Sequence, residues 1–386
     1  MNTDYFQMDD LLTQEHIIIR QSIQDFVRKE IKPVIEEAAQ NHTEIPGLLK
    51  KLGNLGALGC YIPEEYGGAG LDYISYGLIM QELEAGDSAV RSSASVQSSL
   101  VMYPVFTFGS EEQKKKYLPK LAKGELTGSF GLTEPNHGSD PSSMETSLVD
   151  KGSYYLLNGE KLWITNSPVC DVAVVWAKDE QGKIRGVLVE RGMEGFSTPE
   201  IQHKWSLRAS RTGGLVFQNV EIPKENVLPQ VNSLRGPLSC LNSARYGISW
   251  GVIGAARDCY ETALQYALER EQFGKPIASY QLQQKKLAEC VTEITKAQLL
   301  AWRLGVLKNE NKARPEQISM AKRNNVDMAL RIARETRQIV GAMGIVGEYP
   351  MMRHMANLES VITYEGTHDI HLLITGNDIT GINAFF

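Results

Sequence analysis

Glu365 is the residue in this sequence whose surroundings best suit acid–base chemistry. It stands between Tyr364 and Gly366, near the end of the chain of 386 residues. A carboxylate in a tight, mostly apolar setting binds its proton more strongly, so it can act as a base near neutral pH. The glycine beside it lets a substrate approach the backbone closely. The alternative is a surface glutamate that follows a buried strand or helix.

Two polar segments could hold a flat, electron-accepting heterocycle. Residues 128–140 and 163–167 combine hydroxyl side chains and glycines with the aromatic ring of Trp163. Hydroxyl and backbone N–H donors beside an aromatic plane suit such a cofactor. The alternative is a pair of ordinary polar loops, the second with a tryptophan that belongs to the core.

Three other motifs lack a part that their chemistry requires. Residues 68–70 read Gly-Ala-Gly, but no Lys-Ser or Lys-Thr follows, as a phosphate-binding loop would need. His368 and His371 have the spacing of two metal ligands on a helix, yet no third ligand is evident nearby. Ser-His-Asp catalysis would need a nucleophile elbow, which the sequence does not show. We therefore expect no phosphate-binding loop at 68–70, no bound metal at the two histidines and no Ser-His-Asp triad.

Composition and charge exclude several classes of protein. With 42% hydrophobic and 22% charged residues the chain is an ordinary globular protein, and its net charge of -6 does not favour nucleic acid or an anionic membrane. The five cysteines form no CxxC pair, which argues against a disulfide framework or a zinc site. No targeting segment or membrane span is evident. We expect a cytoplasmic protein of bacterial type, or one of the mitochondrial matrix if a presequence was removed.

The periodicity of apolar residues changes twice along the chain. Up to about Gly124 the spacing is helical, with a Gly-rich loop at 63–70. From about 125 to 228 short β-rich runs predominate, and we expect residues 179–183 to join two of them as a turn. After about 238 the spacing is helical again. This order predicts a helical domain, a small sandwich or barrel, and a second helical domain.

Taken together, the motifs resemble those of the acyl-CoA dehydrogenase family. They are Gly-Leu-Thr-Glu-Pro at 131–135, Trp-Ile-Thr at 163–165, Arg-Glu-Gln-Phe-Gly-Lys-Pro at 270–276 and Tyr-Glu-Gly-Thr at 364–367. They follow in the order of the family over nearly the whole chain, and we expect the third to open a helix. Within the family the similarity is to the glutaryl-CoA dehydrogenases, on residues 91–102, 242–247 and 363–371.

The resemblance implies an α+β fold, mostly α, with a homotetramer that binds FAD non-covalently at a subunit contact. It divides the chain into an N-terminal helical domain of residues 1–124, a middle β-barrel or sandwich domain of 125–233 and a C-terminal four-helix bundle of 234–386. The positions that match cofactor contacts of the family are Phe130, Leu132, Thr133, Gly138, Ser139, Trp163, Ile164, Thr165, Arg270, Phe273, Gln281, Gln338, Ile339, Gly341, Ala342, Thr367 and Phe385. Residues 338–342 would come from a neighbouring subunit. The family often has Gly-Gly at 341–342, so the methyl group of Ala342 could loosen a backbone contact with the cofactor.

The resemblance also implies a mechanism. Glu365 would remove the α-proton of an acyl-CoA while the β-hydride passes to the flavin N5, and its backbone N–H would stabilise the thioester oxygen together with a ribityl hydroxyl. Arg91 would bind the far carboxylate of glutaryl-CoA through two hydrogen bonds. The positions that match substrate contacts are Arg91, Ser92, Glu84, Ser139, Leu238, Asn242, Arg245, Tyr364 and Gly366. For Arg91 the alternative is a pair with Glu84 or Asp87 on a helix face, and for Leu238 it is helix packing.

The implied product is crotonyl-CoA, formed when the oxidised acyl group loses carbon dioxide and Glu365 returns a proton. An electron-transferring flavoprotein would accept the electrons, and neither nucleic acid nor membrane would be a partner. Some relatives stop before decarboxylation, and others act on another short acyl-CoA or pass electrons to oxygen. An alternative from a different class of protein is a nucleic-acid-associated binding protein on the same scaffold. The negative net charge and the presence of Glu365 argue against this alternative.

Overall fold

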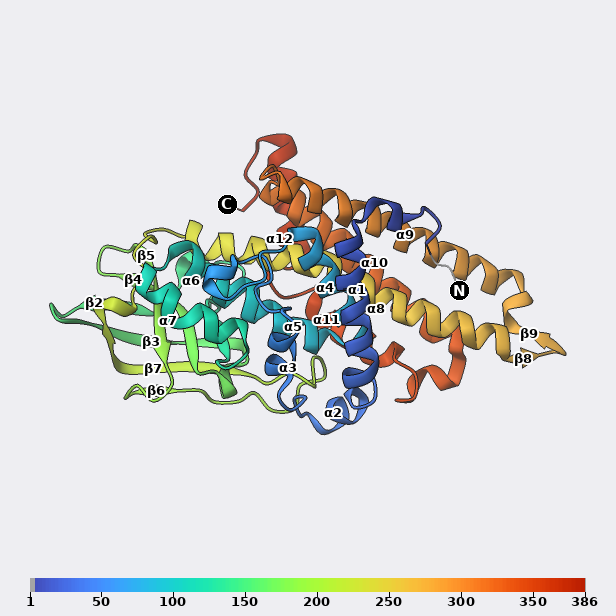
Figure 1. Cartoon of the computed structure of the whole chain (residues 1–386), viewed down its shortest axis with the longest axis horizontal. Helices are drawn as coiled ribbons and strands as arrows, with labels where there is room; N and C mark the ends of the chain where they lie inside the picture. Colours follow the sequence, from blue (N-terminus) through green and yellow to red (C-terminus); the bar gives the residue numbers. More distant parts are fainter. Residues whose placement is uncertain (1–3, 386) are drawn as a thin grey trace.

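The structure is a computed structural model that describes residues 4–385. Figure 1 shows an elongated molecule with the large β-sheet at one end and the long helices of the C-terminal half at the other. The N-terminal helices lie between and against them. The predicted α+β class, mostly α, is confirmed.

The first part of the chain is helical, as its periodicity predicts. Its helices are α1 (Gln14–Phe26), α2 (Ile35–Asn41), α3 (Leu48–Asn54), α4 (Tyr73–Gly86), α5 (Ser88–Ser95), α6 (Tyr103–Phe108) and α7 (Glu111–Ala122), with a π-helical turn, Val96–Met102, between α5 and α6. Asp87 ends α4 and caps α5, because its side chain accepts a hydrogen bond of 2.7 Å from the N–H of Ala89. Residues of α4 and α5 therefore lie on consecutive helices that meet at this corner.

Helix α4 forms the centre of the helical core. All of its residues after Tyr73 are buried, and it packs against α8 (Arg235–Glu269) so closely that glycine is needed at the contact. A methyl group at Gly254 would lie 1.8 Å from the carbonyl oxygen of Gln81, and one at Gly77 would lie 2.5 Å from the ring of Trp250. This close approach brings α4, α5 and α8 together around one set of buried polar side chains.

The middle of the chain forms a curled sheet of seven strands. They are β1 (Gly128–Gly131), β2 (Ser147–Asp150), β3 (Tyr154–Thr165), β4 (Val172–Asp179), β5 (Ile184–Glu190), β6 (Phe196–Ser197) and β7 (Thr212–Pro223). β1 and β2 pair in parallel with successive parts of β4, and the order continues through β3 and β7 to β6, while β5 pairs antiparallel with β4. The predicted hairpin with its turn at 179–183 is confirmed as β4–β5.

Strand β3 is longer than the interpretation of residues 163–167 as a loop allows. β3 continues past Asn158-Gly159 to Thr165, and its register against β7 shifts at this point, which is a bulge rather than a turn. The segment 163–165, interpreted as part of a loop, therefore forms the last residues of β3. Trp163 has φ 64° and is 61% exposed, so the alternative of a core tryptophan is also wrong. A second register shift between Lys161 and Ile164 turns this ring outward.

The last part of the chain is a bundle of helices. They are α8, α9 (Gln281–Asn309), α10 (Pro315–Val340), α11 (Met351–Val361) and α12 (His368–Thr380). Arg270 does not open a helix as expected: it follows the end of α8, and the hairpin of β8 (Glu271–Gln272) and β9 (Lys275–Pro276) intervenes before α9 begins. The glycine at 274, with φ 77°, makes this tight turn, which projects at the far end of the molecule (Figure 1).

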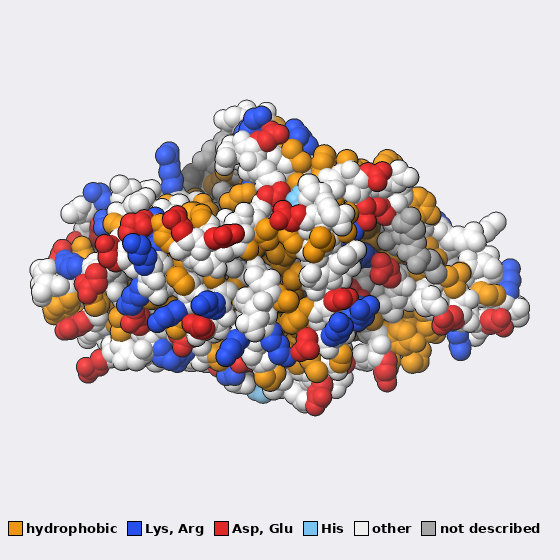
Figure 2. Space-filling view, in the orientation of Figure 1, with side chains coloured by type: hydrophobic (Ala, Val, Ile, Leu, Met, Phe, Trp, Pro, Cys, Tyr) orange, Lys and Arg blue, Asp and Glu red, His pale blue; other side chains and the backbone are white. Residues whose placement is uncertain are grey.

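Surface charge, helix hydropathy and the cysteines can be compared with what the composition predicts. In Figure 2, acidic and basic side chains are mixed over the face that it shows, and no broad basic area appears on it. Within residues 4–385, none of the helices is both long enough and apolar enough to cross a lipid bilayer. All five cysteines are free and buried.

Candidate active site

Glu365 lies in the short turn that joins α11 to α12. Its backbone is left-handed, with φ 54°, and Gly366 follows with φ 96°. A non-glycine residue in this conformation carries strain of about 1–3 kcal/mol and persists only where its surroundings impose it. Thr367 then caps α12 by accepting a hydrogen bond from the N–H of Ile370. The turn thus presents Glu365 from between two well-defined helices.

The carboxylate of Glu365 is more buried than its residue as a whole. The residue is half-buried, whereas Oε2 is buried and has no hydrogen-bond partner among residues 4–385. Burial raises the pKa of this carboxyl, and the positive charges of Arg91 and Arg245 only partly oppose that rise. A buried carboxylate oxygen with no partner is suited to take a proton from a molecule that enters the site.

The raised pKa of Glu365 leads to an expected pH dependence. The base works only when ionised, so kcat/KM should fall as the pH drops through the pKa of the free protein. We expect the midpoint of this fall above the ordinary glutamate value of about 4.3. Steady-state rates measured from pH 4 to 9 check this, and a midpoint at or below about 4.3 would contradict it.

Arg91 and Glu84 form a fully buried ion pair close to Glu365. Both side chains have no exposed surface, and Arg91 Nε donates to Glu84 Oε2 at 2.6 Å while Nη2 donates to Oε1 at 3.3 Å. Nη2 also donates to the hydroxyl of Tyr364, and the guanidinium lies 5.7 Å from the centre of that ring. Nη1 is buried and has no partner in the described chain. One arm of the guanidinium is therefore free.

The alternative for Arg91, an ion pair with Glu84 or Asp87 on a helix face, is partly right. Arg91 does pair with Glu84, but inside the protein rather than on an exposed helix face. Asp87 instead accepts from Arg353 at 2.6 Å and from Asn357 at 2.9 Å. A buried pair that leaves a guanidinium nitrogen unsatisfied costs free energy unless another acceptor meets it.

Two residues of this site were missed from the sequence. Ser95 lies one helical turn after Arg91, and its hydroxyl is buried without a hydrogen bond within residues 4–385. The i, i+4 spacing from Arg91 on a helix could have indicated it. Gly251 of α8 makes room for the ion pair, because a methyl group there would lie 2.2 Å from Glu84 Oε2. No signal in a single sequence distinguishes this glycine from the others.

The remaining expected substrate residues differ in how deeply they are buried. Ser92 is buried in α5, and Arg245 of α8 is buried with its Nε donating to the carbonyl of Glu365 at 2.7 Å. Asn242 accepts from Arg245 Nη1 at 3.2 Å, and Leu238 is half-buried on the same helix. Ser139, by contrast, is exposed in the loop after β1. Arg245, expected to contact substrate, thus holds the backbone of Glu365.

The expected cofactor residues of the β-domain lie side by side. Phe130 is buried in β1, and the loop that follows is tied to β3 because the N–H of Leu162 donates to the carbonyl of Thr133 at 2.9 Å. The exposed ring of Trp163 therefore stands beside the backbone of the loop that carries the other expected contacts. These are Leu132, Thr133, Gly138 and Ser139, with Ile164 and Thr165 next to Trp163 in β3. An exposed aromatic plane next to loop backbone fits a flat heterocycle.

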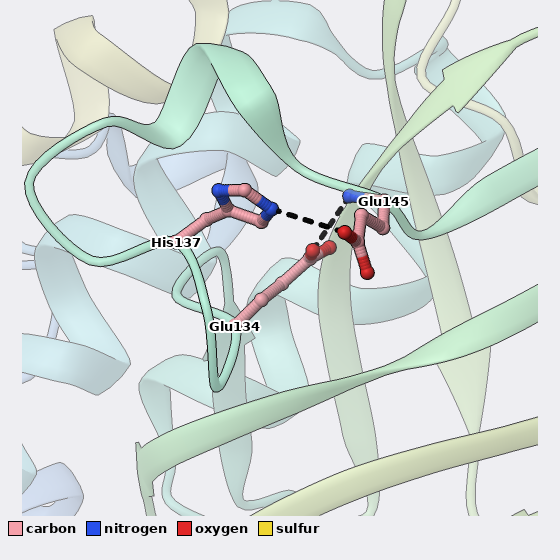
Figure 3. A group of neighbouring side chains, drawn as sticks. All are labelled: Glu134, His137 and Glu145. Carbon is pink, nitrogen blue, oxygen red and sulfur yellow. Dashed lines mark hydrogen bonds and ion pairs between the residues drawn. The ribbon is translucent and has the colours of Figure 1, made fainter.

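Glu134 fixes that loop in place (Figure 3). Its Oε1 accepts from Lys161 Nζ at 2.7 Å and from the N–H and hydroxyl of Thr146, and its Oε2 accepts from the N–H of Glu145 at 2.6 Å. Although burial opposes ionisation, these donors lower its pKa to about 2. Within the described residues Glu134, His137 and Glu145 are the one cluster close enough to share an ion. The oxygens of Glu134 are already engaged, so we assign the cluster to loop structure.

A second group of expected cofactor residues lies far from the first along the molecule. Arg270, the 94% exposed Phe273 and Gln281 sit at the β8–β9 hairpin and the start of α9, at the opposite end from the sheet (Figure 1). Gln338 contacts Lys286 of α9, which places the end of α10 near that helix. Ile339 is buried, whereas Gly341, Ala342 and Phe385 are exposed. One chain does not bring the two groups together.

Comparisons with known proteins relate nearly the whole chain to one family. Family models match residues 13–125 as acyl-CoA dehydrogenase, N-terminal domain, 129–220 as its middle domain and 235–380 as its C-terminal domain. The chain is 37% identical to an acyl-CoA dehydrogenase of Bacillus subtilis (strain 168), over 96% of this chain and 99% of that one. It is 34% identical to a glutaryl-CoA dehydrogenase of Desulfococcus multivorans, over 97% and 99%.

Solved structures extend the similarity to three dimensions. The crystal structure of glutaryl-CoA dehydrogenase from Mycobacterium smegmatis is 48% identical, with a TM-score of 0.97 and full coverage, 100%, of both chains. A second structure of that enzyme, in complex with FADH2, is 49% identical with a TM-score of 0.97, over 99% of this chain and 98% of that one. The present chain therefore belongs to the acyl-CoA dehydrogenase family and is an oxidoreductase.

Proposed function

We propose that this protein oxidises glutaryl-CoA with FAD as its cofactor and releases crotonyl-CoA and carbon dioxide. The observation that carries the proposal is the free Nη1 of Arg91, a fully buried guanidinium nitrogen with no acceptor among residues 4–385. A pocket for a plain fatty acyl chain would gain nothing from a buried cation. The carboxylate at the far end of glutaryl-CoA would satisfy it, with Ser95 as a second donor.

Glu365 is the proposed base. Its unpartnered Oε2 takes the α-proton of the bound thioester, and its backbone N–H donates to the thioester oxygen as negative charge develops there. When bound, FAD accepts the β-hydride at N5. Trp163, Phe130 and the loop at 132–139 are the proposed wall for its ring, which the exposed aromatic plane supports.

Loss of carbon dioxide follows from the same contacts. After oxidation the Cα–Cβ bond is double, so when the far carboxylate leaves as carbon dioxide its bonding electrons pass into the unsaturated thioester. The proton held by Glu365 then adds to the γ-carbon and gives crotonyl-CoA. Glu84 shares the charge of Arg91 through the 2.6 Å hydrogen bond, which moderates the grip of Arg91 on the departing carboxylate.

Mass analysis of the product tests the proposal. Purified protein is mixed with glutaryl-CoA and a dye acceptor, and the acyl-CoA that forms is identified. We expect crotonyl-CoA. Glutaconyl-CoA as the final product would show an enzyme that oxidises without decarboxylation, and no turnover of glutaryl-CoA beside rapid turnover of butyryl-CoA would refute the proposed substrate.

We further propose a homotetramer and an electron-transferring flavoprotein as the electron acceptor. The resemblance to the family suggests both, and the separation of the two groups of cofactor residues in one chain supports a site shared between subunits. Exposed apolar side chains, among them Phe273 at 94% and Leu282 at 73%, lie at the hairpin and α9 where a second subunit would cover them. Light scattering of the purified protein gives the number of chains.

A further inference from the structure

The side chain of Lys322, on α10, contacts the turn that carries Glu365. The side chain has no exposed surface, and its Nζ donates to the carbonyl of Tyr364 at 3.1 Å and to that of Gly366 at 2.9 Å. These two carbonyls flank Glu365, whose own carbonyl accepts from Arg245. Three successive carbonyls of the turn are thus bound by two buried cations.

Lys322 is costly where it stands. It forms no ion pair within residues 4–385, and the other charged groups near it include the cations Arg91 and Arg245 as well as Glu365. Burial lowers its pKa to about 7. An apolar residue would avoid this penalty, so the lysine is expected to do something at the turn that packing alone would not require.

The geometry of the peptide unit indicates the role of Lys322 at this turn. The carbonyl of Tyr364 and the N–H of Glu365 belong to one planar trans peptide, so they point in opposite directions. A cation on the carbonyl fixes the direction of the N–H and polarises it as a donor. The N–H of Glu365 donates no hydrogen bond within the described chain, so it is free to meet a substrate.

We propose that Lys322 is a positioning residue for the acyl-CoA reaction, which fixes the two carbonyls flanking Glu365 and so directs the N–H and the carboxylate of Glu365 toward the thioester. The inference rests on the proposed role of Glu365 as base. It also explains how a left-handed glutamate is maintained, because Lys322 on the carbonyl of Tyr364 and Arg245 on the carbonyl of Glu365 oppose rotation of the two peptides that flank its Cα.

The charges that face Glu365 determine how its titration responds to Lys322. Arg91, Arg245 and Lys322 favour the ionised carboxylate. Two further titratable groups of the turn region, His368 and His371 of α12, are disfavoured as cations by burial, which lowers the pKa of His371 to about 2. Removing Lys322 therefore removes one of three positive charges, and the pKa of Glu365 rises.

The test compares Lys322→Met and Lys322→Gln with the wild type. Lys322→Met, which lacks both hydrogen bonds and the charge, should lower kcat on the order of 10- to 100-fold, because a preorganised donor is misdirected. The acid limb of kcat/KM should move to higher pH, whereas KM should change less than about threefold. Lys322→Gln, which can still donate to a carbonyl, should recover part of kcat without returning the acid limb.

Lys204→Met is the matched control. Lys204 also secures a turn, since its Nζ donates to the carbonyl of Leu207 at 3.1 Å and to the hydroxyl of Thr212 at 3.0 Å. This variant should lower the unfolding midpoint without moving the acid limb. The inference is overturned if the folded Lys322 variants keep kcat within twofold and the acid limb in place, or if the control moves that limb as far. Turnover of glutaryl-CoA by the wild type in the same assays tests the proposed function separately.

Discussion

Glu365→Gln should lower kcat for glutaryl-CoA by about 10³-fold or more, because the amide keeps the shape of the side chain and cannot accept the α-proton. A positioned general base contributes about 10²–10⁴ to the rate, and Glu84, the carboxylate whose charge acts on the neighbouring Tyr364, is already engaged by Arg91. Stopped-flow reduction of the bound flavin by glutaryl-CoA measures this step directly.

The same variant should not be less stable than the wild type. The pKa of Glu365 is raised in the folded protein, so ionisation costs folding free energy as the pH rises above the ordinary glutamate value. A neutral glutamine avoids that cost at pH 7. Thermal unfolding at pH 7 should give an equal or higher midpoint, and turnover near the wild-type rate would remove the base assignment.

Arg91→Met should reduce kcat/KM for glutaryl-CoA by about 10²–10³-fold while the ratio of butyryl-CoA to glutaryl-CoA turnover rises. Truncating one partner of a buried, hydrogen-bonded charge pair costs about 2–5 kcal/mol of binding. The far carboxylate would lose the free Nη1, whereas butyryl-CoA makes no use of it. Initial rates with both substrates give the ratio.

Stability must be separated from specificity in this variant. Arg91→Met leaves Glu84 buried and uncompensated, which costs about 3–5 kcal/mol. The double variant Glu84→Gln/Arg91→Met removes both charges and should recover much of the unfolding midpoint but not the glutaryl-CoA activity. Recovery of both together would show that Arg91 acts only as a partner of Glu84.

Much of the fold and the centre of the site could be predicted from the sequence. The change from helical to strand periodicity near 125, and back before 238, is a property of local side-chain pattern, and the structure follows it. Glu365 and Arg91 were identified because their residue types and neighbours resemble motifs of the family. These features depend on nearby residues in the chain.

What the sequence could not predict depends on tertiary contacts. The outward turn of Trp163 follows from a register shift between β3 and β7, which the local pattern does not show. The hairpin after Arg270 depends on a turn in which Phe273, with φ 53°, is left-handed together with Gly274, and a non-glycine residue rarely adopts that conformation. The two hydrogen bonds of Lys322 join residues more than forty positions apart, as the separations of 42 and 44 show. Only the packed structure brings such residues into one site.

The most direct test of the central claim compares two substrates of equal carbon number on the wild-type protein. Pentanoyl-CoA and glutaryl-CoA differ only at the far end, where one has a methyl group and the other a carboxylate. With Arg91 buried and one nitrogen unsatisfied, kcat/KM should favour glutaryl-CoA by at least about 10²-fold. Equal or faster oxidation of pentanoyl-CoA would contradict the role of Arg91 as the carboxylate clamp.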